Sequence, residues 1–153
     1  MKSIRCILLI AALVSLLLVS CARSSQDRSD NNRPTEDPLS AGQALYQAHC
    51  ATCHGVEGKG QFPDNPYGPD ANDLIGAPPH DPTGHTWHHP DVVLVQITQE
   101  GRSQPGVYPM PAFGDKLTES EIMAILGYIK TWWTPEQIAA QATASAQFTP
   151  SVK

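Results

Sequence analysis

A helical, loop-rich domain is the fold that the sequence predicts. Three segments of the 153-residue chain place apolar residues at helical spacing, over about residues 40–50, 91–100 and 118–133. The 14 prolines and 11 glycines indicate that much of the remaining chain is loop. These observations predict one mainly helical domain with a modest hydrophobic core.

The first predicted helix begins at Ser40, its expected N-cap, and ends at about Cys50. Gly42, Tyr46 and Cys50 follow one another at intervals of four residues, so they share one face. This helix is predicted to cross the last helix at close range. The contact is expected to involve Gly42 and Tyr46 on the first helix and Ile125 and Tyr128 on the last.

Two further helices are expected in the second half of the chain. The middle one covers Asp91–Glu100 and ends at Gly101. The last one begins with a capping box formed by Thr118 and Glu121, and Pro135 stops it. Its apolar stripe consists of Ile122, Ile125, Leu126, Ile129 and Trp133.

Residues 55–90 form a long segment without a convincing period. The segment contains seven prolines and six glycines. A structureless stretch of this length is unusual in a compact domain. It fits such a domain if the loop wraps an internal cofactor that completes the core.

Residues 1–20 are interpreted as a lipoprotein signal peptide. Lys2 and Arg5 precede an apolar run over residues 7–19, which is too short for a confident transmembrane helix. The run ends in Leu18-Val19-Ser20-Cys21, which resembles a bacterial lipobox, so Cys21 is the expected lipidated N-terminus. The alternative is an ordinary signal peptide, or an uncleaved anchor, with an incidental cysteine. Either way the rest of the chain is expected to be exported.

The expected organisation after the signal peptide has three parts. Residues 21–37 are polar, with the lipidated cysteine followed by a disordered tether. The folded domain covers residues 38–133, and residues 134–153 form a tail with room for a short helix. Two or three acyl chains anchor a protein firmly. The expected location is therefore a membrane of the bacterial cell envelope, with the domain on its periplasmic or extracytoplasmic side.

The charge of the chain argues against nucleic acid as a partner. Without residues 1–20 the chain carries eight basic and fifteen acidic side chains, a net charge of −7. A negative surface repels a phosphate backbone. A partner protein with a basic docking patch is compatible with this charge.

The sharpest chemical signal is the motif Cys50-Ala51-Thr52-Cys53-His54. Two thiols one helical turn apart can add across the vinyl groups of a haem, and the adjacent histidine then lies beneath the iron as its proximal ligand. The alternative is a redox-active dithiol of thioredoxin type, which requires a strand before it and a βαβ context. Here a helix precedes the motif, so the sequence predicts one covalent haem c held by Cys50, Cys53 and His54.

Met110 is the expected sixth ligand of the iron. It lies between Pro109 and Pro111, which stiffen the loop that presents its thioether. A neutral, soft sulfur ligand favours ferrous iron and raises the reduction potential. Met123 is expected only to pack, because it lies on the last helix beside the apolar stripe.

Four histidines crowd one loop, namely His80, His85, His88 and His89. They are expected to lie on the surface or to contact haem propionates. The alternatives are a second metal site for copper or zinc, or a histidine in place of Met110 on the iron. Trp87 is expected to donate its indole N–H to a propionate, with simple core packing as the alternative.

Over about residues 38–133 the chain resembles class I cytochrome c. The resemblance rests on the motif at residues 50–54, on Pro109-Met110-Pro111-Ala112-Phe113, and on Ile125-Leu126-Gly127-Tyr128-Ile129-Lys130, in the order typical of the family. It implies an all-α fold of about three main helices around one covalent haem. It also implies Cys50 and Cys53 as attachment sites, His54 as the proximal ligand and Met110 as the distal ligand.

The function expected from these features is one-electron transfer in a bacterial respiratory or related chain, without catalysis. The expected electron donor is a dehydrogenase or a cytochrome, and the expected acceptor is an oxidase or a cupredoxin. No small-molecule substrate is expected. One alternative is a haem peroxidase or gas-binding protein with a labile sixth ligand. Others are a subunit of an oxidase or dehydrogenase complex, and a metal-handling module built on the histidine loop.

Overall fold

A computed structural model of the chain describes residues 37–148. Its elements are α2 (Pro38–His49), α3 (Ala51–His54), the 3₁₀ turn η1 (Thr86–His88), α4 (Asp91–Glu100), α5 (Glu119–Lys130) and α6 (Pro135–Gln147). Between residues 37 and 148 no strand forms, and loop segments pair only at three isolated bridges. The predicted all-α fold is therefore confirmed. The predicted signal peptide, Cys21 and most of the tether lie outside the described residues.

The start of α2 differs from the expectation. Asp37, not Ser40, is the N-cap, and its carboxylate accepts a hydrogen bond from the backbone N–H of Leu39 at 3.4 Å. Pro38 occupies the first turn, where its fixed backbone angle suits a helix and its missing N–H costs nothing. This pair starts the helix two residues before the serine.

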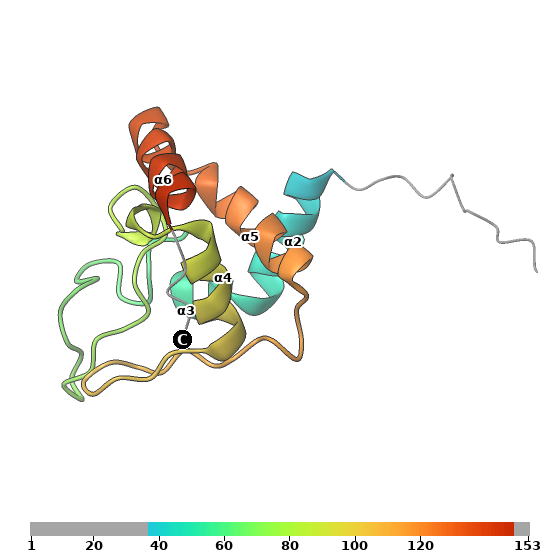
Figure 1. Cartoon of the computed structure of the whole chain (residues 1–153). Helices are drawn as coiled ribbons and strands as arrows, with labels where there is room; N and C mark the ends of the chain where they lie inside the picture. Colours follow the sequence, from blue (N-terminus) through green and yellow to red (C-terminus); the bar gives the residue numbers. More distant parts are fainter. Residues whose placement is uncertain (1–36, 149–153) are drawn as a thin grey trace, which may run out of the picture. The chain divides into compact units, whose positions relative to one another are not determined.

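The predicted crossing of the first and last helices is confirmed. Helices α2 and α5 form the most extensive helix contact in the described part of the chain, and Figure 1 shows them side by side. A Cβ atom added to Gly42 would overlap the backbone carbonyl of Ala124. Tyr46 is fully buried beside this point, with its ring centroid 5.6 Å from that of Tyr128. Glycine thus lets the two backbones approach, and aromatic rings fill the flank.

Helix α5 has the predicted capping box and apolar stripe but a different end. Thr118 and Glu121 each bond the other's backbone. The stripe is buried, with exposed fractions between 1% for Ile122 and 5% for Trp133. The helix ends at Lys130 rather than at Trp133, because residues 131–133 form tighter turns in which each N–H bonds the carbonyl three residues earlier. Thr134 then begins α6 with a second capping box. Trp133 is nevertheless buried in the turn between the two helices.

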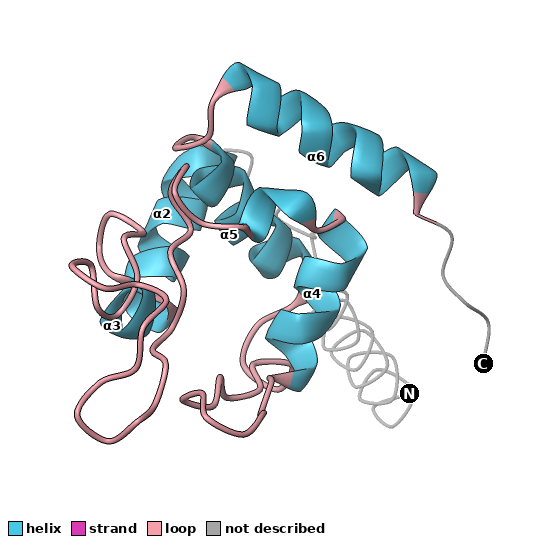
Figure 2. Cartoon of the chain, turned by 90° about the vertical axis from the view of Figure 1, so that its left-hand side faces the viewer, coloured by secondary structure: helices cyan, strands magenta, loops and turns pink. Residues whose placement is uncertain are grey.

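The middle helix, α4, has the predicted bounds and packs on α5. Gly101 ends it with a φ of 73°, a conformation that suits glycine. A side chain at Gly101 would also meet the backbone of Met110 and Ala112, so the glycine lets the following loop fold back against the helix end. Figure 2 shows the long loops before and after α4.

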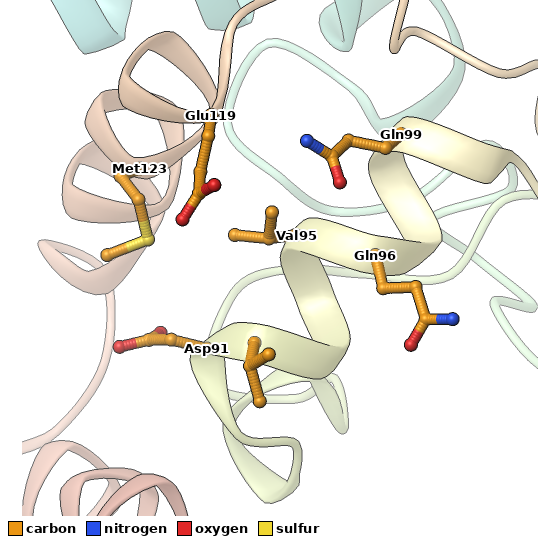
Figure 3. Close-up of a pocket in the computed structure, with 7 residues that line it drawn as sticks. Asp91, Val95, Gln96, Gln99, Glu119 and Met123 are labelled. Atoms are coloured by element: carbon orange, nitrogen blue, oxygen red, sulfur yellow. The ribbon is translucent and has the colours of Figure 1, made fainter. Parts of the chain in front are cut away.

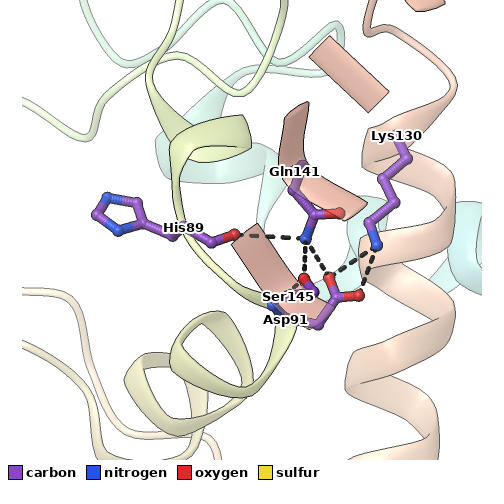
Figure 4. Close-up of polar contacts among 5 residues, drawn as sticks. All are labelled: His89, Asp91, Lys130, Gln141 and Ser145. Carbon is purple, nitrogen blue, oxygen red and sulfur yellow. Dashed lines mark hydrogen bonds and ion pairs between the residues drawn. The ribbon is translucent and has the colours of Figure 1, made fainter. Parts of the chain in front are cut away.

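Helix α6 fastens the tail to the histidine-rich loop through a buried amide, as Figure 4 shows. The amide nitrogen of Gln141, a residue only 2% exposed, donates to the His89 carbonyl at 3.3 Å and to the Asp91 carboxylate at 2.7 Å. Lys130 pairs with the same carboxylate at 2.7 Å, and Ser145 accepts the backbone N–H of Asp91 at 3.0 Å. The network joins α4, α5 and α6 at the start of α4.

No helix between residues 37 and 148 combines the length and the apolar character that a membrane crossing requires.

Candidate haem-binding site

The three residues of the haem motif lie together at the joint between α2 and α3. Cys50 ends α2 by donating its N–H to the carbonyl of Tyr46 at 2.8 Å. Its own carbonyl then accepts the N–H of Cys53 at 3.1 Å and of His54 at 2.9 Å. This single turn brings both thiols and the imidazole to one end of the helix. Gly55, with a φ of 80°, ends the turn.

Both thiols are free, and Cys50 is half-buried while Cys53 is exposed. Burial raises the pKa of the Cys50 thiol to about 11, and the neighbouring Cys53 adds to the rise. A redox-active dithiol requires the opposite, a lowered pKa that gives a thiolate at neutral pH. The pair is therefore poorly suited to thiol–disulfide exchange, whereas its spacing suits two thioether bonds.

The imidazole of His54 is held from its Nδ1 side. It is 8% exposed, and Nδ1 lies 2.9 Å from the backbone carbonyl oxygen of Pro78. Because a carbonyl only accepts, Nδ1 must carry the proton, and the lone pair is on Nε2. Desolvation lowers the pKa of His54, and the bond to Pro78 opposes this effect. The ring is thus a neutral imidazole with Nε2 available to a metal, as metal-bound histidines require.

The segment that supplies this carbonyl is tied to the motif. The N–H of Gly60 donates to the His54 carbonyl at 2.8 Å. Gln61 and Ala77 then pair, through a backbone bond of 2.9 Å and a side-chain bond of 3.0 Å. These bonds place Pro78 next to the imidazole. Sequence reasoning missed Pro78, although a second partner for a ligating histidine is a general requirement.

Met110 comes from a separate loop, and its backbone is well held. It exchanges two hydrogen bonds of 2.9 Å with Arg102, across the end of α4. The neighbouring Tyr108 donates its hydroxyl to Asp70 at 2.8 Å and its N–H to the carbonyl of Ile75 at 2.9 Å. The Met110 side chain is half-buried. The structure shows how the loop is fixed, and ligation by its sulfur stays a prediction.

The four histidines of the loop do not act as one group. His80 stacks on His54, with ring centroids 4.0 Å apart, whereas the ring of His88 lies against Trp87 at 3.7 Å. His85 and His89 form a separate pair at 5.6 Å. Between residues 37 and 148 no three histidine, cysteine or acidic side chains gather as a metal site would require. The second-metal alternative thus finds no support in this part of the chain.

Trp87 has a different partner from the one expected. Its indole N–H donates to the carbonyl of Gly84 at 3.0 Å. This bond satisfies the indole within its own loop. A hydrogen bond from Trp87 to a propionate stays a prediction. The indole has a single N–H, so this bond would have to replace the bond to the Gly84 carbonyl.

A pocket between α4 and α5 is separate from the motif. Its lining, shown in Figure 3, consists of Asp91, Val92, Val95, Gln96, Gln99, Glu119 and Met123. None of the residues predicted for the haem site contributes to it. Met123, expected to pack beside the apolar stripe, is instead 41% exposed.

The residues at the α2–α3 joint fit a covalent haem. They supply two free thiols one turn apart and a neutral, oriented imidazole directly after the second thiol. In an all-α fold whose long loop after the motif is bonded back to His54, this donor set defines a protein of the c-type haem class.

The chain belongs to the cytochrome c family. The family profile described as cytochrome c matches residues 39–133. Members of this family are electron-transfer proteins with covalently bound haem c, so haem c is the cofactor of this chain.

Two known proteins illustrate the likeness. Cytochrome c-551 of Bacillus subtilis (strain 168) is 37% identical over 62 residues, which are 39% of this chain and 55% of that protein. The match therefore spans about half the length of the curated relative. The crystal structure of cytochrome cL from the marine methylotroph Methylophaga aminisulfidivorans MPT superposes with a TM-score of 0.50. The superposed region covers 78% of this chain and 71% of the cytochrome cL chain, at 18% sequence identity. A likeness at this identity supports the fold alone.

Proposed function

We propose that this protein is a one-electron carrier of a bacterial respiratory or related electron-transport chain, with the haem iron held between His54 and Met110. Haem supplies a reversible Fe(III)/Fe(II) couple when it is bound. The chain attaches the group, fixes its axial ligands and passes electrons between redox proteins. No bond to a substrate forms in this role, so the protein is not an enzyme.

The observation that carries this proposal is the state of His54. Its Nδ1 proton is committed to Pro78, which leaves Nε2 as the only basic nitrogen. Fixed, permanent ligands limit the rearrangement that accompanies a change of oxidation state, which suits electron transfer. Cys50 and Cys53, on the same turn, hold the group even in a domain with a small core.

Support for Met110 comes from the rigidity of its loop. Two backbone bonds to Arg102 and the flanking prolines fix the main chain on both sides of the residue. A thioether presented in this way loses little entropy on ligation. A methionine ligand raises the reduction potential above that of a bis-histidine site.

Replacing Met110 by alanine should open the iron to small ligands. We expect the reduced M110A protein to bind carbon monoxide stoichiometrically and rapidly, and its midpoint potential to fall. The wild type should bind little, because its sixth position is filled. Absorption spectra of the reduced protein under carbon monoxide measure the difference. Met123→Ala is the matched control, since this exposed methionine should not touch the iron.

One result would overturn the carrier proposal, and another would overturn only the assignment of Met110. Rapid and complete carbon monoxide binding by the wild type would show an open site, as in a peroxidase or gas-binding protein. Equal, weak binding by wild type and M110A would show that another residue, such as a loop histidine, fills the position.

We also propose that Cys21 is lipidated and holds the domain at a membrane of the cell envelope. The support is the apolar run that ends in Leu18-Val19-Ser20-Cys21 and the polar segment that follows. Expressed in a bacterium, the full chain should partition with membranes and into detergent. Cys21→Ser should lose the mass of the acyl chains. A wild-type mature protein without lipid mass, by mass spectrometry, would contradict this anchor.

A further inference from the structure

The ring of His80 stacks on the ring of His54, the candidate iron ligand. The two imidazoles are nearly parallel, with an interplanar angle of 23° and centroids 4.0 Å apart. An offset stack of this kind restricts how a ring can tilt. The sequence predicts that His80 lies on the surface or contacts a haem propionate, and it does not anticipate this contact.

His80 is itself held on several sides. Its backbone N–H donates to the carbonyl of Gly58 at 2.7 Å, and its carbonyl accepts the indole N–H of Trp133 at 2.8 Å. In the side chain, Nδ1 lies 2.8 Å from the hydroxyl oxygen of Thr86. The fully buried Tyr46 ring lies roughly perpendicular to the His80 ring, with centroids 6.4 Å apart. The ring therefore offers a fixed surface to His54.

The hydrogen bond to Pro78 does not by itself fix the plane of His54. Rotation about the bond between Cβ and the ring has a broad energy profile, and one bond at Nδ1 still allows the ring to rock about that contact. A parallel ring at van der Waals distance removes this freedom. The two contacts together define both the direction of Nε2 and the orientation of the plane.

We propose that His80 is a positioning residue that sets the plane of the His54 imidazole relative to the haem. The inference rests on the proposed function in one respect, that His54 is the iron ligand. In ferric low-spin haem the plane of an axial imidazole determines how its π orbitals overlap with the iron, and thereby the distribution of unpaired spin over the haem methyl groups.

The test is the proton NMR spectrum of the ferric holoprotein, which records the hyperfine-shifted haem methyl resonances. His80→Ala should change their order or spread, because the imidazole gains freedom to tilt. His80→Phe keeps a flat ring in the stack and should retain the wild-type pattern. His85→Ala is the control on the same loop, since His85 is exposed and its ring lies near those of Tyr67 and His89.

A second variant covers the case in which H80A does not fold. Thr86→Val removes the hydroxyl that fixes the His80 ring and keeps a similar shape, so a smaller change in the same direction is expected. A wild-type methyl pattern in H80A, or in T86V if H80A does not fold, would overturn the positioning role and leave ligation intact. In wild-type protein with isotope-labelled histidine, an iron-bound His54 should give hyperfine-shifted ring signals. Their absence would overturn the ligation of the iron by His54 as well.

Discussion

The variant with alanine at both Cys50 and Cys53 should contain no covalent haem. On the proposed assignment each thiol forms one thioether bond with a vinyl group. The loss of both would then leave only the axial bonds from His54 and Met110 to the iron. The modest protein core gives a free haem little additional hold. Acidified organic solvent should then extract the pigment completely from the variant and not at all from the wild type.

The single variants add a graded result to this experiment. Cys50→Ala and Cys53→Ala should each retain one thioether bond and leave one vinyl group unreacted. The absorption maximum of the reduced pyridine complex depends on the number of unreacted vinyl groups, so it measures the number of thioether bonds. Thr52→Ala is the control, because Thr52 is exposed between the two cysteines and should retain both bonds. Haem that stays attached to the double variant would contradict the assignment of both residues.

The crossing of α2 and α5 should be the most sensitive point for stability. In Gly42→Ala the new methyl group overlaps the carbonyl of Ala124, a backbone atom that cannot move without shifting the helix. We expect the free energy of unfolding to fall by about 3 kcal/mol, as for other cases of overpacking. Denaturant unfolding of the holoprotein, followed by circular dichroism, measures the effect.

Gly127→Ala is the matched control on the same helix. Gly127 lies in the interior of α5, is exposed, and has open space where a methyl group would go. Alanine is the better helix former, so this variant should be more stable than the wild type by roughly 0.5–1 kcal/mol. Equal losses in the two variants would show that helix propensity, and not the close crossing, governs position 42.

Local signals in the sequence were sufficient for most of the helical frame. Three of these signals each involve only a few neighbouring residues, and each is present in the structure. They are the capping box at Thr118, the helix end at Gly101 and the face shared by Gly42 and Tyr46. The predicted start of α2 was wrong, because Asp37 as N-cap and Pro38 in the first turn together favour a helix start more strongly than Ser40 does. Short-range rules compete at helix ends, where the outcome depends on small energy differences.

The surroundings of the haem motif were much less accessible from the sequence. Pro78 and His80 meet His54 from a loop with no period, more than twenty residues further along the chain. Their positions follow from long-range bonds, such as those of Gly60 and Trp133, which no spacing rule encodes. The motif predicted the chemistry, and the fold supplied the residues that orient it.

The absorption spectrum of the oxidised full-length protein tests the central claim most directly. A haem iron held by His54 and Met110 should show the weak far-red band that arises from charge transfer between sulfur and ferric iron. The band should be present in the wild type and in Met123→Ala, and it should vanish in Met110→Ala. Its absence from the wild type would contradict His/Met ligation and with it the proposal of a closed, high-potential electron carrier.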